Sequence, residues 1–325
     1  MKKALRYIVL VFVILVVLVG IAAAYIRFGL PDTGDPENIK IAYTPERIER
    51  GKYLANHVAL CVDCHSTRDW NRFAGPIVPG TYGKGGEAFT KDMGLPGNFY
   101  SANITPAAIG SYTDGELFRA ITTGVKRNGK AMFPLMPYLN YGKMDREDIY
   151  DIIAYIRTFA PQENKVAESE ADFPVSLLIN TMPKKASFTK RPPASDTLAY
   201  GAYLVNVAAC SECHTPFEKG SYDESLRFAG GRAFGLPGGT LYSSNITPAA
   251  NGIGKLTRAD FIARFKQYAD SNYHSPAIDI RKEYNSVMPW TMYAGMSESD
   301  LGAVYAYLRT LQPIEHEVAK FVARK

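Results

Sequence analysis

The residues GKYLANHVALCVDCH (51–65) and GAYLVNVAACSECH (201–214) are two versions of one motif. Both open with Gly-x-Tyr-Leu and close with Cys-x-x-Cys-His. A motif of this length that occurs twice predicts a duplicated structural unit. The two copies hold all the cysteines of the 325-residue chain, which are Cys61, Cys64, Cys210 and Cys213.

The duplication extends over most of the chain, with the motifs in the same order in both copies. Partners lie between 142 and 155 residues apart, which corresponds to two whole domains and not to a solenoid. We expect one domain over residues 40–160, a linker over 161–197 and a second domain over 198–315. The further paired stretches are Arg72-Phe-Ala-Gly with Arg227-Phe-Ala-Gly, Tyr100-Ser-Ala-Asn-Ile-Thr-Pro with Tyr242-Ser-Ser-Asn-Ile-Thr-Pro, Met136-Pro-Tyr with Met288-Pro-Trp, and Ala154-Tyr-Ile-Arg-Thr with Ala306-Tyr-Leu-Arg-Thr.

Each unit is predicted to be all-α, with a few helices joined by long loops. The first helix is expected over about residues 44–63, and its copy over about 196–212. Helix-start signals predict two more helices in each unit. These signals are at Thr113 and Asp145 in the first unit and at Thr257 and Ser297 in the second.

The Gly- and Pro-rich stretches 74–110 and 228–254 show little regular periodicity. Loops of this length inside a compact domain need something else to pack on. A large prosthetic group in each unit would supply that surface.

The overall charge is mild, with 37 Lys and Arg against 32 Asp and Glu, a net charge of +5. With 46% hydrophobic residues, this composition excludes an intrinsically disordered protein. No strongly basic stripe is present, which argues against nucleic-acid binding. The linker is locally basic, and we interpret it as a solvated connection, with a docking patch for an acidic partner as the alternative. Its basic residues are Lys184, Lys185, Lys190 and Arg191.

Residues 1–30 predict a membrane anchor. The uncharged run over residues 7–26 follows the basic Lys2, Lys3 and Arg6. It is long enough for a transmembrane helix, whereas the three alanines at 22–24 would suit the cleavage site of a signal peptide. In both cases the positive-inside rule places the rest of the chain outside the cytoplasm. We therefore expect a bacterial inner-membrane protein with its bulk on the periplasmic side.

Cys-x-x-Cys-His is the attachment pattern of c-type haem. Residues three apart share one helix face, so both thiols can reach the two vinyl groups on one edge of a porphyrin. The histidine that follows, His65 or His214, can bind the iron from the same side. Two copies of the pattern predict two covalently bound haem c groups.

Three other interpretations fit less well. Zinc ribbons place two Cys-x-x-Cys pairs about 15–20 residues apart, whereas here a whole repeat separates them. A thioredoxin-like redox pair needs a βαβ context, which the sequence lacks. Structural disulfides would suit an exported protein but leave the two histidines unexplained.

The other iron ligand is expected from residues that both copies share. Met136 and Met288 lie in equivalent Pro-bounded loops and are the predicted ligands, with core packing as the alternative. Met144 and Met296 also correspond, but each precedes a helix-start signal and is expected to pack. The remaining histidines have no counterpart and are poor candidates; these are His57, His274 and His316.

Four polar residues of the repeated motifs are further candidates. Arg72 and Arg227 are expected either to pair with haem propionates or to be plain surface residues. Asn103 and Asn245 either tie loop backbone near the haem edge or are simple turn residues. No catalytic residue is predicted.

These motifs resemble the class I cytochrome c family, with Cys-x-x-Cys-His on the first helix, a Met-Pro-aromatic loop and a last helix that reads AYIRT or AYLRT. The paired arrangement resembles the cytochrome subunits of membrane-bound bacterial alcohol and sugar-acid dehydrogenases. Those subunits typically have three such domains, whereas this chain has two. The resemblance covers roughly residues 45–315 and implies covalent haem in an all-α fold. It also implies axial coordination by His65 with Met136 and by His214 with Met288.

We therefore predict an electron-transfer protein and not an enzyme. It would be a membrane-anchored dihaem cytochrome that carries electrons between a donor and an acceptor protein, with dehydrogenase or oxidase subunits as possible partners. A dihaem enzyme such as a cytochrome c peroxidase is the alternative. That enzyme would need a haem with an open sixth position, and a methionine loop in both copies speaks against it.

Overall fold

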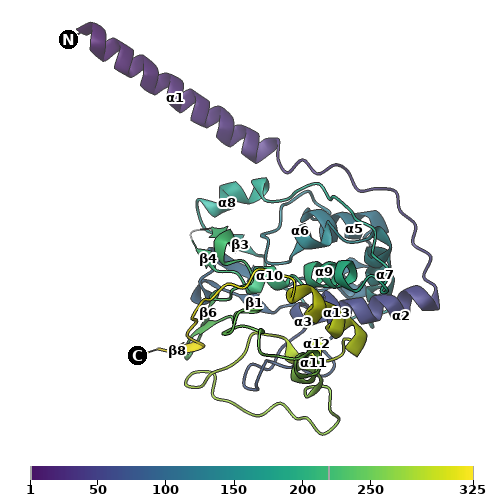
Figure 1. The fold of residues 1–325 in the computed structure, drawn as a ribbon. Helices are drawn as coiled ribbons and strands as arrows, with labels where there is room; N and C mark the ends of the chain where they lie inside the picture. The colour runs from purple at the N-terminus through teal and green to yellow at the C-terminus, as the bar shows by residue number, and fades with distance from the viewer. Residues whose placement is uncertain (1, 219, 325) are drawn as a thin grey trace.

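The computed structural model describes residues 2–218 and 220–324. Helix α1 (Lys2–Phe28) projects away from the rest of the molecule (Figure 1). Its large hydrophobic side chains are exposed along its length. No other helix in the described ranges is long and apolar enough to cross a membrane. An apolar helix whose side chains are largely exposed suits a membrane span or a signal sequence.

Two pairs of crossing helices organise the body. In the first unit α2 (Pro45–Tyr53) packs on α7 (Arg146–Ile156). In the second unit α9 (Thr197–Val207) packs on α13 (Glu298–Leu308). Buried apolar residues of both units join in one continuous core, with Leu54 and Leu204 fully buried.

A glycine lies at each helix crossing. A Cβ atom on Gly51 would be 1.8 Å from the carbonyl oxygen of Asp151. A Cβ atom on Gly201 would be 2.1 Å from the carbonyl oxygen of Ala303. The glycine of Gly-x-Tyr-Leu is therefore required because the backbones of the two helices touch there.

The predicted helix starts are confirmed. Thr113 caps α5 (Asp114–Thr123) and Thr257 caps α11 (Arg258–Lys266), each in a reciprocal capping box with the third residue of the helix. Asp145 and Ser297 cap α7 and α13 through their side-chain oxygens. These caps satisfy backbone N–H groups that would otherwise lack partners in the first turn.

A π-helical turn absorbs the one residue by which the first opening motif is longer. Helix α2 continues into the π turn η1 (Leu54–Val58), whereas α9 remains α-helical to its end. A π turn takes up one extra residue within a helix. As a result, His57 and Asn206 reach equivalent positions.

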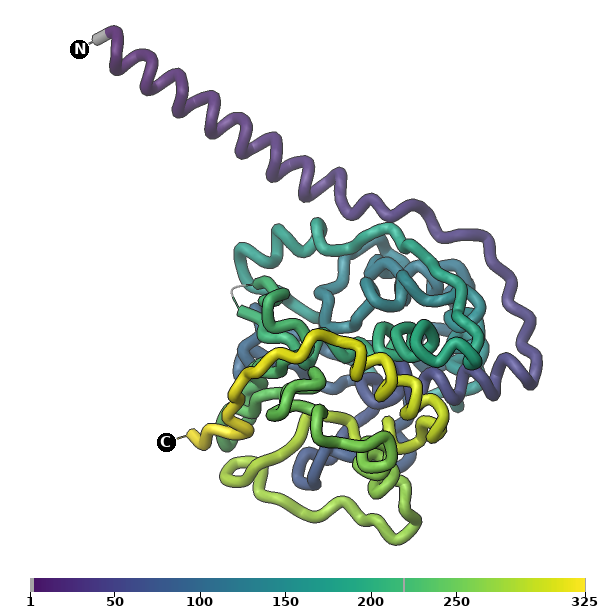
Figure 2. Tube along the Cα trace, viewed as in Figure 1, coloured from purple at the N-terminus to yellow at the C-terminus, as the bar shows by residue number. Residues whose placement is uncertain are grey.

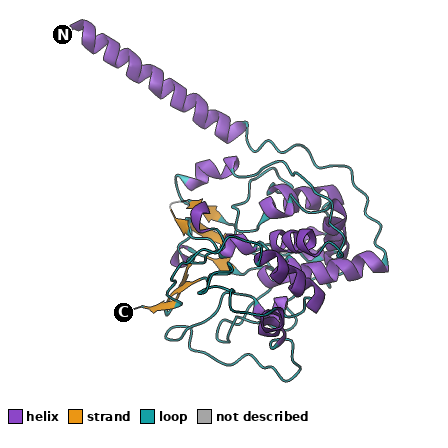
Figure 3. Cartoon of the chain, in the orientation of Figure 1, coloured by secondary structure: helices purple, strands orange, loops and turns teal. Residues whose placement is uncertain are grey.

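The all-α prediction is wrong for the long loops, which contain small antiparallel sheets (Figure 3). The sheets are β1 (Ala88–Phe89), β2 (Gly97–Tyr100) and β3 (Glu170–Ala171); β4 (Phe217–Glu218) and β5 (Ser221–Tyr222); and β6 (Ala233–Leu236), β7 (Gly239–Tyr242) and β8 (Phe321–Ala323). The first and third sheets have the same register, because Gly97 faces Ala171 and Gly239 faces Ala323. In both, the segment after the last helix returns to pair with a loop, and local periodicity does not report such distant pairing.

Short helices and 3₁₀ turns complete the structure. They are α3 (Cys61–Cys64), η2 (Lys91–Met93), α4 (Pro106–Ile109), α6 (Tyr138–Tyr141), α8 (Val175–Leu178), η3 (Ile179–Thr181), α10 (Cys210–Cys213), η4 (Glu224–Leu226) and α12 (Trp290–Tyr293). Four of them, α3, α6, α10 and α12, lie where the Cys-x-x-Cys and Met-Pro-aromatic motifs occur.

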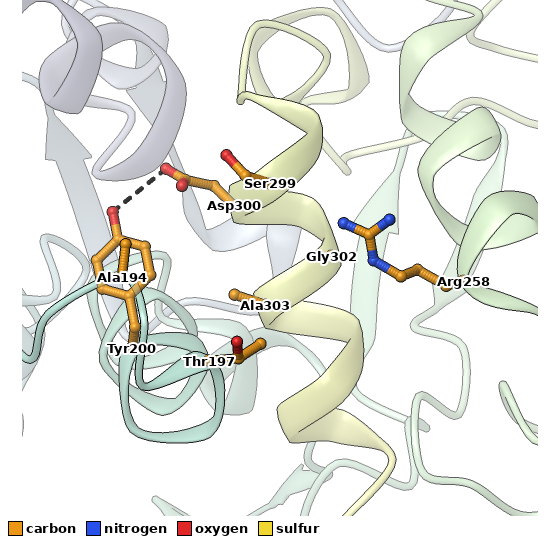
Figure 4. Close-up of a pocket in the computed structure, with 8 residues that line it drawn as sticks. All are labelled: Ala194, Thr197, Tyr200, Arg258, Ser299, Asp300, Gly302 and Ala303. Carbon is orange, nitrogen blue, oxygen red and sulfur yellow. Dashed lines mark hydrogen bonds between the residues drawn. The ribbon is translucent and has the colours of Figure 1, made fainter.

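The two units contact each other through equivalent tyrosine–aspartate hydrogen bonds. The Tyr53 hydroxyl donates to Asp300 at 2.6 Å, and the Tyr203 hydroxyl donates to Asp148 at 2.6 Å. Asp300 also accepts a hydrogen bond from Tyr200 (Figure 4). Each unit thus inserts a tyrosine of its first helix at the start of the last helix of the other.

A second pair of contacts follows the same pattern. Nδ1 of His57 donates to the carbonyl oxygen of Met292 at 2.8 Å. The Asn206 side chain donates to the carbonyl oxygen of Asn140 at 3.1 Å. Because Met292 and Asn140 occupy equivalent places on α12 and α6, the two units are related by an approximate two-fold arrangement.

The sequence pairing of the two Arg-Phe-Ala-Gly stretches is wrong in three dimensions. The N–H of Gly230 donates to the carbonyl oxygen of His214, and in the first unit Gly85 makes this bond to His65. Gly85, and not Gly75, is therefore the counterpart of Gly230. The loops differ in length, so a four-residue match placed the stretches in a false register.

The first Arg-Phe-Ala-Gly stretch instead joins the two units. The N–H of Phe73 donates to the carbonyl oxygen of Pro276, and the N–H of Ala74 donates to the side chain of Asn285. These partners lie between α11 and Met288, a segment that is longer than its counterpart in the first unit. The extra segment of the second unit therefore serves as a clasp on the first.

The linker is more than the solvated connection that its composition suggests. The Phe188 ring lies 5.2 Å from that of Phe118, and Arg191 forms an ion pair with Asp148. The segment between α1 and α2 also follows the surface of the first unit (Figure 2). There Glu37 pairs with Arg146, and the N–H of Ile41 donates to Asp114.

We predict that Gly51→Ala lowers the free energy of unfolding by about 3 kcal/mol or more. The new Cβ atom would collide with the backbone of the facing helix, which cannot move aside as a flexible side chain could. Urea unfolding followed by circular dichroism would measure this loss. Glu49→Ala, at an exposed position of the same helix, is the control and should change stability by less than about 0.5 kcal/mol. Equal stabilities of the two variants would contradict the tight crossing.

We predict that stability falls as the pH drops through the ordinary pKa of histidine. Burial lowers the pKa of His57, and the charges of Lys266 and Lys52 act in the same direction. Below about pH 6.5 the unfolded chain therefore binds a proton that the folded chain does not, so acid favours unfolding.

His57→Asn should remove this contribution, because Asn206 makes the same contact without titrating. The measurement is urea unfolding of both proteins at about pH 7.5 and about pH 5.5. The same acid-induced loss of stability in both proteins would refute the role of His57.

Candidate functional site

Each Cys-x-x-Cys pair lies on one short helical turn. Cys61 and Cys64 are the ends of α3, and Cys210 and Cys213 are the ends of α10. The four thiols are not joined in disulfides. Since residues three apart lie on one helix face, both sulfurs of a pair can reach the same edge of a ligand.

A left-handed residue precedes each cysteine turn. Leu60 has φ 57° and Ala209 has φ 51°, a conformation that is unfavourable for residues with a side chain. Buried tyrosines of the methionine loops hold this bend. The Tyr141 hydroxyl donates to the carbonyl oxygen of Ala59 at 2.7 Å, and the Tyr293 hydroxyl donates to that of Ala208 at 3.0 Å.

Each motif histidine is held by a backbone carbonyl. Nδ1 of His65 lies 2.7 Å from the carbonyl oxygen of Ala102, and Nδ1 of His214 lies 2.7 Å from that of Ser244. A carbonyl oxygen only accepts, so Nδ1 carries the proton and the Nε2 lone pair is left for a metal. Burial lowers the pKa of both histidines, which favours the neutral imidazole that coordinates a metal.

The repeated Asn-Ile-Thr-Pro stretch fixes that carbonyl. Oδ1 of Asn103 accepts from the N–H and the hydroxyl of Thr105, both at 2.8 Å, while its side-chain amide donates to Gln162 at 2.7 Å. Asn245 makes the same three contacts with Thr247 and Ile314. The asparagine therefore forms the expected turn and also ties the loop to the segment after the last helix, while its place near a haem edge stays a prediction.

The thiols are accessible to solvent but lie among many protein atoms. Cys64 and Cys213 are exposed, and Cys61 and Cys210 are half-buried. Burial nevertheless raises the pKa of Cys61, Cys64 and Cys210 to about 12. Because the sulfur atoms are accessible to solvent although protein atoms surround them, there is space for a ligand beside each cysteine turn. Together with the free Nε2 of the adjacent histidine, this arrangement fits a covalently bound haem.

The zinc interpretation lacks support in the described part of the chain. Nowhere there do three or more His, Cys, Asp or Glu side chains gather as metal ligands. Each motif instead has two thiols on one helical turn and a histidine directly after it, an order that is typical of haem c attachment.

The two methionine pairs differ in burial. Met144 and Met296 are almost completely buried, with 0% and 2% of their surface exposed, so they pack in the core as expected. Met136 and Met288 are half-buried at the edge of that core. Both lie just before a short helix, and the carbonyl oxygen of each accepts from the N–H two residues later. Their coordination of iron stays a prediction.

Arginines that the sequence analysis did not select lie beside the thiols. Arg68 pairs with Asp63 at 3.0 Å, both side chains being only 6% exposed. In the second unit Arg232 bonds to the carbonyl oxygen of Glu212 and to the hydroxyl of Tyr222. Because these arginines do not occupy matching sequence positions, the repeat did not reveal them.

The other predicted polar residues lie in different surroundings. Arg72 donates to the carbonyl oxygen of Ser275 across the contact between the units. Arg227 is half exposed and pairs with Glu224 at 2.9 Å. Nδ1 of His316 contacts the carbonyl oxygen of Ala229 at 3.1 Å. A propionate contact for Arg72 or Arg227 stays a prediction.

Residues 198–312 match the cytochrome c family. This part of the chain is a cytochrome c domain. The cytochrome c domain contains Cys210, Cys213 and His214, together with Met288 and the carbonyl that holds the histidine. The first unit repeats each of these features at its own positions.

Relatives are similar over most of the chain. The chain is 30% identical over 295 residues to the fructose dehydrogenase cytochrome subunit of Gluconobacter japonicus. The matched region covers 85% of this chain and 54% of that protein. The chain is 27% identical over 300 residues to the cytochrome c subunit of a quinone alcohol dehydrogenase of Komagataeibacter europaeus, covering 84% and 58%. A diheme cytochrome of Cereibacter sphaeroides is 29% identical over 199 residues, covering 58% and 64%. The chain thus spans less than two thirds of each relative.

We predict that Asn245→Ala lowers the free energy of unfolding by about 2–4 kcal/mol, because it leaves the buried N–H of Thr247 without an acceptor and removes the hydrogen bond to the carbonyl oxygen of Ile314. Asn103→Ala should do the same in the first unit. Thermal or urea unfolding would measure both effects. Asn272→Ala, at an exposed loop position, is the control, and a loss no larger than that of the control would contradict the anchoring role.

Proposed function

We propose that the protein is a membrane-anchored dihaem c-type cytochrome that transfers electrons and is not itself an enzyme. The observation that carries this proposal is the pair of histidines, each placed after a Cys-x-x-Cys turn with Nδ1 held by a backbone carbonyl. The same arrangement twice in one chain supports two haems. Covalent haem c is also what membership of the second unit in the cytochrome c family implies.

The chain's own residues would hold each haem from two sides. Cys61 and Cys64, and equally Cys210 and Cys213, would attach it through thioethers. His65 or His214 would bind the iron through Nε2, with Met136 or Met288 on the opposite side. A bound haem supplies a one-electron couple, and thioether sulfur as a ligand favours the reduced state.

The protein environment suits electron transfer rather than substrate chemistry. The tyrosines and asparagines that hold the bends and loops are buried and hydrogen-bonded, so each ligand would be held rigidly. Rigid ligation leaves no open position for a substrate and reduces the rearrangement that accompanies a change of charge. Arg68 and Arg232, with Arg72 and Arg227, are the candidates to offset the propionate charges.

We further propose two haem-binding domains, over residues 40–160 and 198–315, joined by residues 161–197. The repeated helix crossings, caps and sheet register support this division. The shared core and the clasp at Asn285 indicate that the two domains stay together as one relay.

The proposed setting is the periplasmic face of the bacterial inner membrane. Helix α1 is largely apolar and exposed and has basic residues in its first turns, which supports a span with the units outside the cytoplasm. Relatives are named as cytochrome subunits of fructose, gluconate and alcohol dehydrogenases. A dehydrogenase is therefore the proposed electron donor, and a respiratory component the acceptor.

Replacement of one distal ligand tests the assignment. We predict that Met288→Ala keeps haem attached at Cys210 and Cys213 but changes the absorption and magnetic spectra of one haem of the two. Met296→Leu, at a buried methionine of the same unit, is the matched control and should leave both haem spectra unchanged. A spectrum that Met288→Ala does not alter would remove Met288 as a ligand.

A further inference from the structure

The linker contains an uncharged apolar stretch that the two haem sites do not use. Residues 173–182 read FPVSLLINTM. The stretch follows strand β3 and contains helix α8 and the 3₁₀ turn η3. The neighbouring linker residues are mainly charged or polar, so this stretch is distinct in composition from the rest of the connection.

This stretch lies where α1 meets the body of the molecule (Figure 1). The side-chain amide of Asn180 donates to the carbonyl oxygen of Ile26 in the last turns of α1, at 3.1 Å. Nζ of Lys185, just after the stretch, lies 3.8 Å from Oδ2 of Asp32, just after α1. If α1 spans a bilayer, its end and α8 must therefore lie at the same level of the membrane surface.

Two large apolar side chains of the stretch are exposed. Phe173 is 82% exposed, the highest value for a large hydrophobic residue of the described chain beyond α1. Leu178 is 41% exposed, and Phe28 at the end of α1 is 85% exposed. Such residues in one place mark a surface that binds another apolar phase.

The charges around the stretch suit a lipid surface. Lys184 is exposed just after it, where a cation can meet anionic headgroups, and its neighbour Lys185 is paired with Asp32. Asp172 directly before it is paired with Lys91 at 2.8 Å, so its charge is compensated. An apolar segment with lysines at its edge is typical of segments that lie in the membrane interface.

We propose that residues 173–182 lie in the outer interface of the bilayer that α1 spans, with Phe173 and Leu178 among the lipid headgroups and upper acyl chains. This inference rests on the membrane anchoring proposed above. The segment would act as a second point of attachment. A single helix would let the two haem units swing about its end, whereas two points fix which face they turn towards the membrane.

Depth measurements on the full haem-loaded chain test this proposal. Phe173→Cys and Leu178→Cys would each carry a spin label in nanodiscs of phosphatidylcholine and phosphatidylglycerol, with no other protein present. Power saturation then compares collisions with oxygen, which enters lipid, and with a water-soluble nickel complex. Leu198→Cys, 51% exposed in the second unit, and Val13→Cys, within α1, are the aqueous and lipid controls.

We expect labels at 173 and 178 to show an oxygen-to-nickel collision ratio several-fold above that at 198 and below that at 13. A ratio at 173 and 178 equal to that at 198, with 13 in lipid, would overturn the membrane contact and leave a partner protein as the occupant of this surface. An aqueous ratio at 13 would overturn the anchor and this contact together. Haem spectra of the four variants report separately on the electron-carrier proposal.

Discussion

One hydrogen bond, from Nδ1 of the motif histidine to a backbone carbonyl, is the constraint on which the site depends. The bonds from His65 to Ala102 and from His214 to Ser244 both measure 2.7 Å. They fix the tautomer and the ring orientation, so Nε2 becomes the free ligand atom. Everything around them serves to keep the carbonyl in place. The asparagine of Asn-Ile-Thr-Pro shapes the loop, and the segment after the last helix secures it.

The two units depend on each other as well as on their own ligands. Tyrosines of the two opening helices donate to aspartates at the start of the opposite closing helices, and these aspartates are almost completely buried. A buried carboxylate without its donors would be costly, so the contact favours one arrangement of the units. The clasp between residues 70–75 and 275–285 adds hydrogen bonds on the other side. In a chain built this way, the two proposed redox sites would be held at a fixed relative position rather than moving independently.

The proposed membrane attachment and the proposed electron relay are linked through geometry. The apolar helix α1 leaves the body beside residues 173–182, so the linker serves both the connection between units and the contact with α1. An electron carrier gains from such restriction, because it limits the orientations in which its partners meet it. The relatives, as cytochrome subunits of dehydrogenases, indicate the kind of partner that such a restriction would favour.

The sequence alone was enough for the duplication, the cysteine and histidine motifs, the helix caps and the apolar N-terminal helix, because each of these is written in residues close together in the chain. The sequence led to wrong predictions where a feature depends on residues that are far apart in the chain. The sheets form because a segment returns from the end of each unit, and the two Arg-Phe-Ala-Gly stretches match in letters but not in hydrogen bonds. The carbonyls that hold the histidines, the arginines beside the thiols and the exchange of tyrosines between units also required the folded chain. The histidine and tyrosine contacts join residues tens to hundreds of positions apart, and no local pattern specifies which backbone oxygen will lie 2.7 Å from an imidazole.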